Sequence, residues 1–245
     1  MGTINEDSGT IGENPEDTIL SEEQADFALQ RSGIYRFLAT AFNQLPDLEL
    51  AENLKKLEAG DMTSAFTLEG EMPSEMAEGL QLIEDYVLSC KTKAHEEITT
   101  ELGVDRARLL RGVRYADKIP APYESLFLED GQEAYTTLID VRKCYREAGL
   151  SVSSDARERA DYIGIELDFM HYLTAQEAVA WQENDSAGIT TSIENQHSFL
   201  ANHLALWAPK FCRVMFGEAT TDFYRGIARL LEAFMLVENE RIIRD

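Results

Sequence analysis

Acidic side chains dominate the residues that could do chemistry in this sequence. On a helix predicted to begin at Asp155, residues Glu158, Asp161, Ile165 and Asp168 follow at spacings of three, four and three. Such spacings place side chains on one face of an α-helix. The pattern therefore predicts a row of carboxylates with one apolar interruption. A row of this kind can orient a cationic ligand and favours Arg over Lys, because a guanidinium pairs with carboxylates through two parallel hydrogen bonds.

An apolar segment precedes this row in the chain. Residues 120–122 read Pro-Ala-Pro, which excludes a continuous helix. The residues that follow are large and mostly apolar: Tyr123, Glu124, Ser125, Leu126, Phe127 and Leu128. Non-helical segments are frequent places for binding surfaces. Taken together, the two segments predict an apolar groove with carboxylates along its rim.

A purely structural interpretation stands beside this one. Acidic residues in a first helical turn, such as Glu158 and Asp161, also favour the positive end of the helix dipole. The apolar residues of the same helix nearly encircle it, which indicates a central core helix: Tyr162, Ile163, Leu167, Phe169, Met170 and Leu173. Phe127 is equally suited to covering a helical bundle.

Motifs for catalysis or cofactors are nearly absent. The sequence has no phosphate-binding glycine loop, no G-x-S-x-G and no H-E-x-x-H. A di-iron helical bundle needs two Glu-x-x-His motifs, and only Glu194 with His197 matches, since Asp168 and His171 carry the wrong acid. Three cysteines without a C-x-x-C favour neither a disulfide framework nor a zinc site. We therefore expect no cofactor and no catalytic residues, and keep the di-iron enzyme as an alternative.

A basic cluster interrupts the acidic sequence at Arg106, Arg108, Arg111, Arg114 and Lys118. It could hold a phosphate group. We favour the alternative, which is ion pairing with the surrounding acidic residues of the same chain.

Composition restricts the partners and the location. The chain has 245 residues and 27.6 kDa, with 22 Lys and Arg against 45 Asp and Glu, a net charge of −23. Nucleic acid and anionic membranes repel such a chain, so a cationic partner is expected. Uninterrupted apolar runs such as Ala233 to Val237 have five residues, whereas a membrane span needs about 20. Residues 1–20 lack the features of a secretory signal, and we expect a cytoplasmic protein.

Helical periodicity covers most of the chain and predicts an all-α fold. We expect an acidic flexible tail over residues 1–20 and one helical domain over 21–245, starting at a capping box that begins with Ser21. About eight or nine helices are predicted, over residues 21–45, 47–57, 73–88, 92–101, 105–111, 132–148, 155–181, 185–207 and 218–245. Residues 58–71 are predicted as a loop and 112–131 as a long connection or hinge. Such a connection permits exchange of helices between two copies, so both a monomer and a swapped dimer stay open.

Several of these segments resemble one known family. The segments are Tyr35-Arg36-Phe37-Leu38, Val141-Arg142-x-x-Tyr145-Arg146, Tyr123 to Leu128, Glu158 to Met170, and His203-Leu204-x-x-Trp207-x-Pro209-x-Phe211-Cys212. Together they are similar to the TorD/DmsD family of cytoplasmic chaperones for molybdenum-containing reductases. The resemblance covers residues ~25–240. The family's E-P-x-D-H signature reads E-R-A-D-Y here, so Arg159 replaces the proline and Tyr162 replaces the histidine.

The resemblance implies binding rather than catalysis. Members of the family bind the twin-arginine signal peptide of a client reductase, or its apo form, until the molybdenum cofactor is inserted. Such a peptide has a cationic and an apolar part, which fits the predicted groove. The peptide-binding residues expected here are Tyr35, Tyr123, Glu124, Leu126, Phe127, Glu158, Asp161, Tyr162, Ile165 and Asp168. An alternative within the same class is a NarJ-type assembly factor that binds the mature subunit of a nitrate-reductase-like enzyme.

Overall fold

The computed structural model describes residues 15–58, 60–66, 72–111, 120–127, 133–153 and 158–244, and these are almost entirely helical. The helices are α1 (Pro15–Asn43), α2 (Leu48–Lys56), α3 (Asp61–Ala65), α4 (Ser74–Cys90), α5 (His95–Leu110), α6 (Glu124–Phe127), α7 (Glu133–Glu147), α8 (Ile163–Gln182), α9 (Ser186–Phe199), the π-helical turn η1 (Leu200–Leu204), α10 (Ala205–Glu218) and α11 (Asp222–Arg244). Apart from one isolated β-bridge, these ranges contain no strand. The all-α prediction is confirmed, and the described part holds nine helices of nine residues or more.

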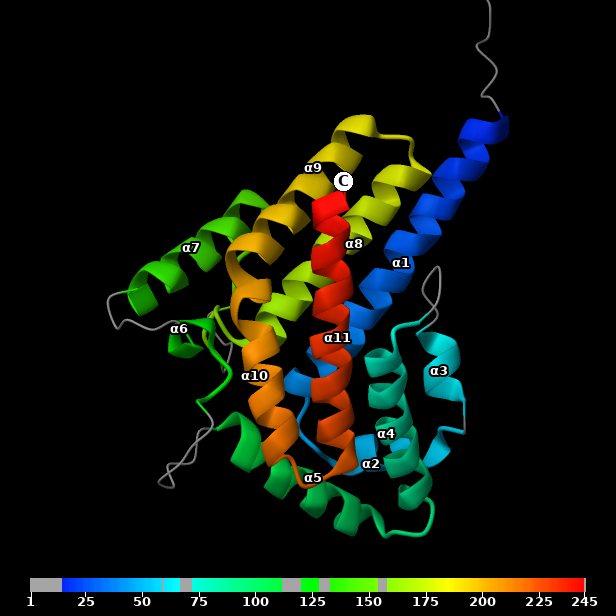
Figure 1. Cartoon of the computed structure of the whole chain (residues 1–245), viewed down its shortest axis with the longest axis vertical. Helices are drawn as coiled ribbons and strands as arrows, with labels where there is room; N and C mark the ends of the chain where they lie inside the picture. The colour runs from blue at the N-terminus through cyan, green and yellow to red at the C-terminus, as the bar shows by residue number, and fades with distance from the viewer. Residues whose placement is uncertain are drawn as a thin grey trace, which may run out of the picture.

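Two groups of packed helices form the centre of the molecule. Helix α1 packs along α8, and α11 packs against α4 and α10 (Figure 1). Aromatic rings fill the space between them: Tyr35 of α1 meets Phe234 of α11 at 4.8 Å between ring centroids, and Phe42 meets Phe211 of α10 at 6.0 Å. One continuous apolar core results.

Glycines allow α4 and α11 to approach closely. A Cβ added at Gly79 would lie 2.7 Å from the backbone nitrogen of Leu230, and one at Gly226 would lie 2.6 Å from the carbonyl oxygen of Gly79. Both distances are shorter than a van der Waals contact, so only glycine fits at this crossing.

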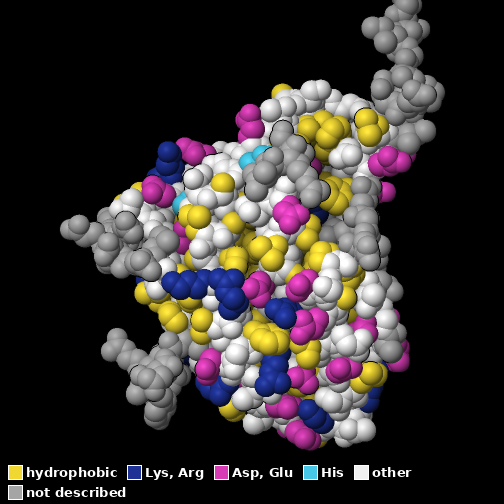
Figure 2. All heavy atoms as spheres, in the orientation of Figure 1, with side chains coloured by type: hydrophobic (Ala, Val, Ile, Leu, Met, Phe, Trp, Pro, Cys, Tyr) yellow, Lys and Arg dark blue, Asp and Glu magenta, His cyan; other side chains and the backbone are white. Residues whose placement is uncertain are grey.

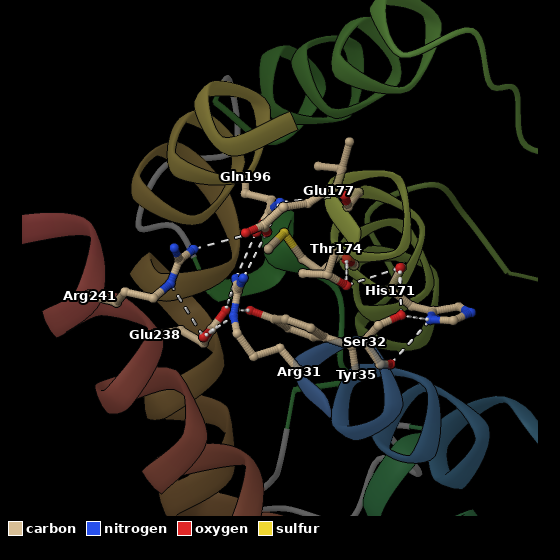
Figure 3. A network of polar contacts seen from close by, with 11 residues as sticks. Arg31, Ser32, Tyr35, His171, Thr174, Glu177, Gln196, Glu238 and Arg241 are labelled. Carbon is tan, nitrogen blue, oxygen red and sulfur yellow. Dashed lines mark hydrogen bonds and ion pairs between the residues drawn. The ribbon is translucent and has the colours of Figure 1, made fainter. Parts of the chain in front are cut away.

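A buried polar network links four helices (Figure 3). Arg31 of α1 donates to Glu238 of α11 at 2.8 and 2.7 Å, to Glu177 of α8 at 2.9 Å and to Gln196 of α9 at 2.7 Å. Tyr35 donates to the same Glu238 carboxylate at 2.8 Å. Burial alone raises the pKa of Glu238, but the charge and hydrogen bonds of Arg31 outweigh it and lower that pKa below the ordinary value. The network therefore keeps a charged pair in the core and fixes four helices relative to one another.

The first helix begins earlier than predicted. Helix α1 starts at Pro15, six residues before the expected cap at Ser21. Proline suits the first turn of a helix. The Ser21 hydroxyl instead donates to the carbonyl oxygen of Trp181 at 2.5 Å, and so ties α1 to the end of α8. The predicted tail overlaps this helix at residues 15–20, and its residues 1–14 lie outside the described ones.

Three further boundaries correct the sequence prediction. Helix α5 continues through Gly103, because a single glycine inside a helix costs only about 1 kcal/mol and its neighbour Leu102 is fully buried. The short helix α3 lies within the predicted loop 58–71. Helix α10 continues past Pro209 to Glu218, and the π-helical turn η1 directly before it supplies a wider turn upstream of the proline.

Other predicted ends are confirmed. Asp47 caps α2 by accepting a hydrogen bond from the Leu50 amide at 2.8 Å, and Gly149 ends α7 with a φ of 77°. Of the connection 112–131, residues 112–119 and 128–131 lie outside the described residues. In the described part of the chain, no helix combines the length and the hydropathy that a membrane crossing requires. On the face shown in Figure 2, acidic and basic side chains intermingle in the lower half of the molecule.

Candidate functional site

A short backbone pairing joins the two segments that sequence analysis singles out. Tyr123 and Tyr162 form the isolated antiparallel bridge. The amide of Glu124 donates to the carbonyl of Asp161 at 2.9 Å, and the amide of Ile163 donates to the carbonyl of Pro122 at 3.0 Å. Residues 120–127 and 158–163 are therefore held side by side, as predicted from their chemistry.

The predicted row of carboxylates on one helix is wrong. Helix α8 begins at Ile163 with Tyr162 as its N-cap, so Glu158 and Asp161 lie in the non-helical segment before it. The Asp155 of the predicted capping box lies outside the described residues. The apolar run from residue 163 onward forms the core helix, as expected, whereas Tyr162 before it is extended and pairs with Tyr123.

Asp161 is fully buried and supports the structure of this region. Its carboxylate accepts hydrogen bonds from the Ser125 hydroxyl at 2.6 Å and from Arg159 at 2.6 and 3.0 Å. Burial alone raises the pKa of Asp161, but the hydrogen bonds from Arg159 and Ser125 lower it below the ordinary value. A carboxylate satisfied in this way has little capacity left for a ligand.

Tyr123, Glu158 and Arg159 form a partly exposed cluster beside it. The Tyr123 hydroxyl donates to the Glu158 carboxylate, and the Arg159 guanidinium lies 4.7 Å above the Tyr123 ring. Tyr162 packs 5.5 Å from the same ring and donates its hydroxyl to the carbonyl of Phe42 at 2.8 Å. Glu158 is thus half-buried and remains within reach of a ligand.

Two other predicted site residues point into the core. Glu124 is buried, and both of its carboxylate oxygens lie 3.1 Å from Nδ1 of His203. Phe127 packs between Trp207 and Phe211 at centroid distances of 5.4 and 5.8 Å. These two side chains hold helix α6 against η1 and α10.

A groove runs next to this region, between α7 and the start of α8. Its larger part has a volume of about 670 Å³ and is lined by Ile139, Arg142, Tyr145, Arg146, Ser151, Val152, Ser153, Glu158, Arg159 and Ala160. Its second part, about 270 Å³, is lined by Tyr145, Leu150, Ser151, Val152, Ser153, Ile165, Asp168 and Phe169. The two parts have Tyr145 and residues 151–153 in common as lining and therefore adjoin each other. We call them the arginine end and the apolar end.

Charges differ between the two ends of the groove. The arginine end carries Arg142, Arg146 and Arg159 together with Glu158. The apolar end has one charged residue, Asp168, which accepts a hydrogen bond from Asn43 at 2.8 Å. Partial burial raises the pKa of the Asp168 carboxyl. The groove thus has three arginines and one carboxylate at one end and a single carboxylate at the other, rather than the rim of carboxylates that the sequence predicts.

A second apolar hollow of about 160 Å³ lies between α1, α2 and α11. It is lined by Phe37, Thr40, Ala41, Gln44, Leu50, Asn53, Leu54, Leu57, Phe223 and Tyr224. None of these side chains carries a charge, so this hollow offers nothing that would orient a charged ligand.

The predicted site residues fall into two groups. Glu158, Ile165 and Asp168 line the groove, Tyr123 contacts Glu158, and Leu126 is exposed on α6. The others are buried and do not line it: Tyr35, Glu124, Phe127, Asp161 and Tyr162.

Sequence reasoning missed the contribution of α7 to the groove. Arg142, Tyr145 and Arg146 line it, together with Val152 beyond the helix. The sequence contains a signal for this contribution, because residues 142, 145 and 146 share one face of the helix predicted over 132–148.

The residues proposed for a di-iron site are not gathered together. Glu194 is exposed on α9, and Asp168 bonds to Asn43 at the groove. Among the described residues, no group of three or more His, Cys, Asp or Glu side chains is placed to hold a metal ion.

Comparison with known proteins gives one family and several relatives. The sequence profile of the family described as nitrate reductase delta subunit matches residues 69–213. A perchlorate reductase assembly chaperone protein of Dechloromonas aromatica is 25% identical over 227 residues, which cover 90% of this chain and 93% of that protein. The chaperone protein TorD of Photobacterium profundum is 26% identical over 87% of this chain and 94% of its own length. The chaperone protein TorD of Vibrio atlanticus is 27% identical over 87% of this chain and 95% of its own length.

Proposed function

This chain belongs to the nitrate reductase delta subunit family, which groups redox-enzyme maturation chaperones of the NarJ and TorD type, and we propose that it binds the twin-arginine leader of a molybdenum-containing reductase. The relatives are named as chaperones and not as enzymes. A reductase as the client is suggested by the relative that is named a perchlorate reductase assembly chaperone. A cytoplasmic location follows from the proposal itself, since a leader must be bound before export.

The proposal rests on the groove, whose two ends differ in charge and in apolar character. A twin-arginine leader has a cationic part followed by an apolar part. Its apolar part fits the side chains of the apolar end: Tyr145, Leu150, Val152, Ile165 and Phe169. The leader's arginines are then placed beside Asp168, because the cations of the arginine end repel them. The charges of the groove thus select one direction for the bound peptide.

Apolar contacts and ion pairs contribute different amounts of free energy to peptide binding. Burying a few hundred Å² of apolar peptide at about 25 cal/mol/Å² contributes roughly 8–12 kcal/mol. Ordering a flexible peptide removes about 2–5 kcal/mol of this. An exposed ion pair to Asp168 adds about 0–1 kcal/mol. Apolar contacts therefore set the affinity and the carboxylate sets the orientation, with a Kd of about micromolar, or roughly −8 kcal/mol.

Calorimetric titration of the full chain with a twin-arginine leader peptide tests the proposal. Asp168→Lys replaces attraction with repulsion at the apolar end, and we expect it to weaken binding about tenfold, which corresponds to about 1.4 kcal/mol. Glu183→Lys is the matched control, since Glu183 is exposed at the C-cap of the same helix and does not line the groove. The absence of binding by the unmodified protein at tens of micromolar, or an equal effect of both variants, would contradict the proposal.

A second candidate ligand is the mature body of the client enzyme. The family description, nitrate reductase delta subunit, favours it, because NarJ-type factors bind a subunit rather than an export signal. Two forms of the client, with and without the leader, distinguish the candidates in a pull-down with the full chain. Equal capture of both forms favours the mature subunit, and capture of only the leader-bearing form favours the leader.

A further inference from the structure

Three titratable side chains from three elements form a row outside the groove. Sγ of Cys144 on α7 lies 3.7 Å from Nε2 of His203 in η1. The other ring nitrogen of His203, Nδ1, lies 3.1 Å from both carboxylate oxygens of Glu124 on α6. A thiol, an imidazole and a carboxylate in this order form the arrangement in which a histidine activates a nucleophile and a carboxylate orients the histidine.

Burial and charge favour a protonated His203. Burial alone lowers the pKa of His203, but its contacts with Cys144 and Glu124 outweigh that effect and raise it to about 9. Glu166 of α8 faces the same cluster, and burial together with the charge of Glu124 raises its pKa well above the ordinary value.

Exposure separates Cys144 from the other thiols. Cys90 and Cys212 are buried, whereas Cys144 is partly exposed. The ring of Phe199 lies 5.0 Å from that of His203 and covers one side of the imidazole. Cys144 is thus the thiol residue with partial exposure to solvent, while His203 and Glu124 beside it are buried. A histidine that served packing alone would not need a thiol on one nitrogen and a buried carboxylate on the other.

We propose that Cys144 is a histidine-activated thiol and a site of modification by low-molecular-weight disulfides. The Cys144 sulfur attacks one sulfur of the disulfide, so that a mixed disulfide forms and the original sulfur–sulfur bond breaks. Cys144 is oxidised and the released half of the disulfide is reduced to a thiol. The proton of the Cys144 thiol passes by way of the His203 imidazole to the leaving thiolate. This inference does not depend on leader binding.

The rate of Cys144 modification as a function of pH tests the proposal. Timed reaction of the full chain with iodoacetamide, followed by intact mass spectrometry, gives the rate, and Cys144→Ser assigns the reacting thiol. A short peptide with a single cysteine is the reference, because its free thiol, with a pKa near 8.5, is only about 1% thiolate at pH 6.5. We expect Cys144, activated by His203, to react about tenfold faster than the reference at pH 6.5, and this difference to shrink toward pH 8.5.

Variants of the two supporting residues complete the test. His203→Gln and Glu124→Gln are expected to slow the reaction at pH 6.5 at least tenfold and to restore its dependence on pH, with the helical circular dichroism unchanged. Oxidised glutathione is then expected to add one glutathionyl group to the unmodified protein and none to Cys144→Ser. A wild-type rate that stays below the reference and rises with pH as the reference does would overturn the proposal without any variant. So would a His203→Gln protein that is folded and reacts at the wild-type rate.

Discussion

Removal of the buried guanidinium of Arg31 should strongly destabilise the protein at neutral pH. Arg31→Met keeps an unbranched apolar side chain but leaves Glu177 and Glu238 buried without the cation that lies 2.9 and 2.7 Å from them. Removing one partner of a buried ion pair costs about 3–5 kcal/mol. This is a large part of the 5–15 kcal/mol by which folded domains are typically stable.

The loss of stability caused by Arg31→Met should also depend on pH, and the titration of Glu238 decides whether it grows or shrinks as the pH rises. In the wild type the pKa of Glu238 is lowered, so its contribution to stability is present above the unfolded value of about 4.3 and is lost as the pH falls through the folded value. Without Arg31, the charge of Arg241 and the hydrogen bond from Tyr35 still lower that pKa, but the charge and hydrogen bonds of Arg31 are lost while burial continues to raise it. The pKa of Glu238 is therefore higher in the variant than in the wild type, and the variant loses stability relative to the wild type as the pH rises. We expect the difference between the two proteins to be larger at about pH 7 than at about pH 5.

Urea unfolding followed by circular dichroism measures this difference. With a slope of about 2–3 kcal/mol/M, the midpoint at neutral pH should fall by roughly 1–2.5 M. Arg36→Met is the matched control, because Arg36 is exposed on the same helix, and it should change stability by no more than about 0.5 kcal/mol. A loss below about 1 kcal/mol for Arg31→Met, equal at both pH values, would refute the reasoning.

Three further stability predictions can be checked by the same unfolding measurements. Glu166→Gln should gain stability relative to the wild type as the pH rises from about 4 to 7. The pKa of Glu166 is raised in the folded protein, so the wild type loses stability over this pH range, whereas glutamine does not titrate. A stability difference that does not change with pH would contradict this. Asp161→Asn should cost about 1.5–3 kcal/mol at neutral pH, and its deficit should shrink in acid, where the wild type loses the contribution of a carboxylate with a lowered pKa. Gly79→Ala should cost about 1–3 kcal/mol, because its Cβ would meet the backbone of α11. The control Gly33→Ala, where the added Cβ has no atom within 4 Å, should gain about 0.5–1 kcal/mol; equal effects would contradict the close approach.

The helical fold could be predicted from local patterns, because apolar periodicity and caps act within a few residues. Asp47 caps α2 and Gly149 ends α7 as their residue types indicate. At two places where prediction failed, the starts of α1 and α8, a tertiary contact decided the outcome. The Ser21 hydroxyl bonds to the end of α8, and the start of that helix depends on the pairing of Tyr162 with Tyr123.

The site was predicted less completely than the fold. Sequence analysis assigned residues 120–127 and 158–163 to the same region, and they lie side by side. It also assigned Asp161 and Glu124 to ligand binding, whereas in the structure both carboxylates bond to side chains of the same chain. A carboxylate that has a buried donor cannot be told from a free one by sequence alone. The role of Tyr145 in the groove depends on the position of α7 relative to α8, which no local pattern specifies.

Photo-crosslinking of a leader peptide to the full chain tests the central claim most directly. A leader with photo-leucine in its apolar part needs no substitution in the protein, and mass spectrometry of the digested product locates the crosslink. Our account predicts crosslinks at the apolar end of the groove, within residues 145–153 and 165–169. Crosslinks concentrated in the uncharged hollow at Phe37, Leu50 and Phe223, or spread evenly over the surface, would contradict it.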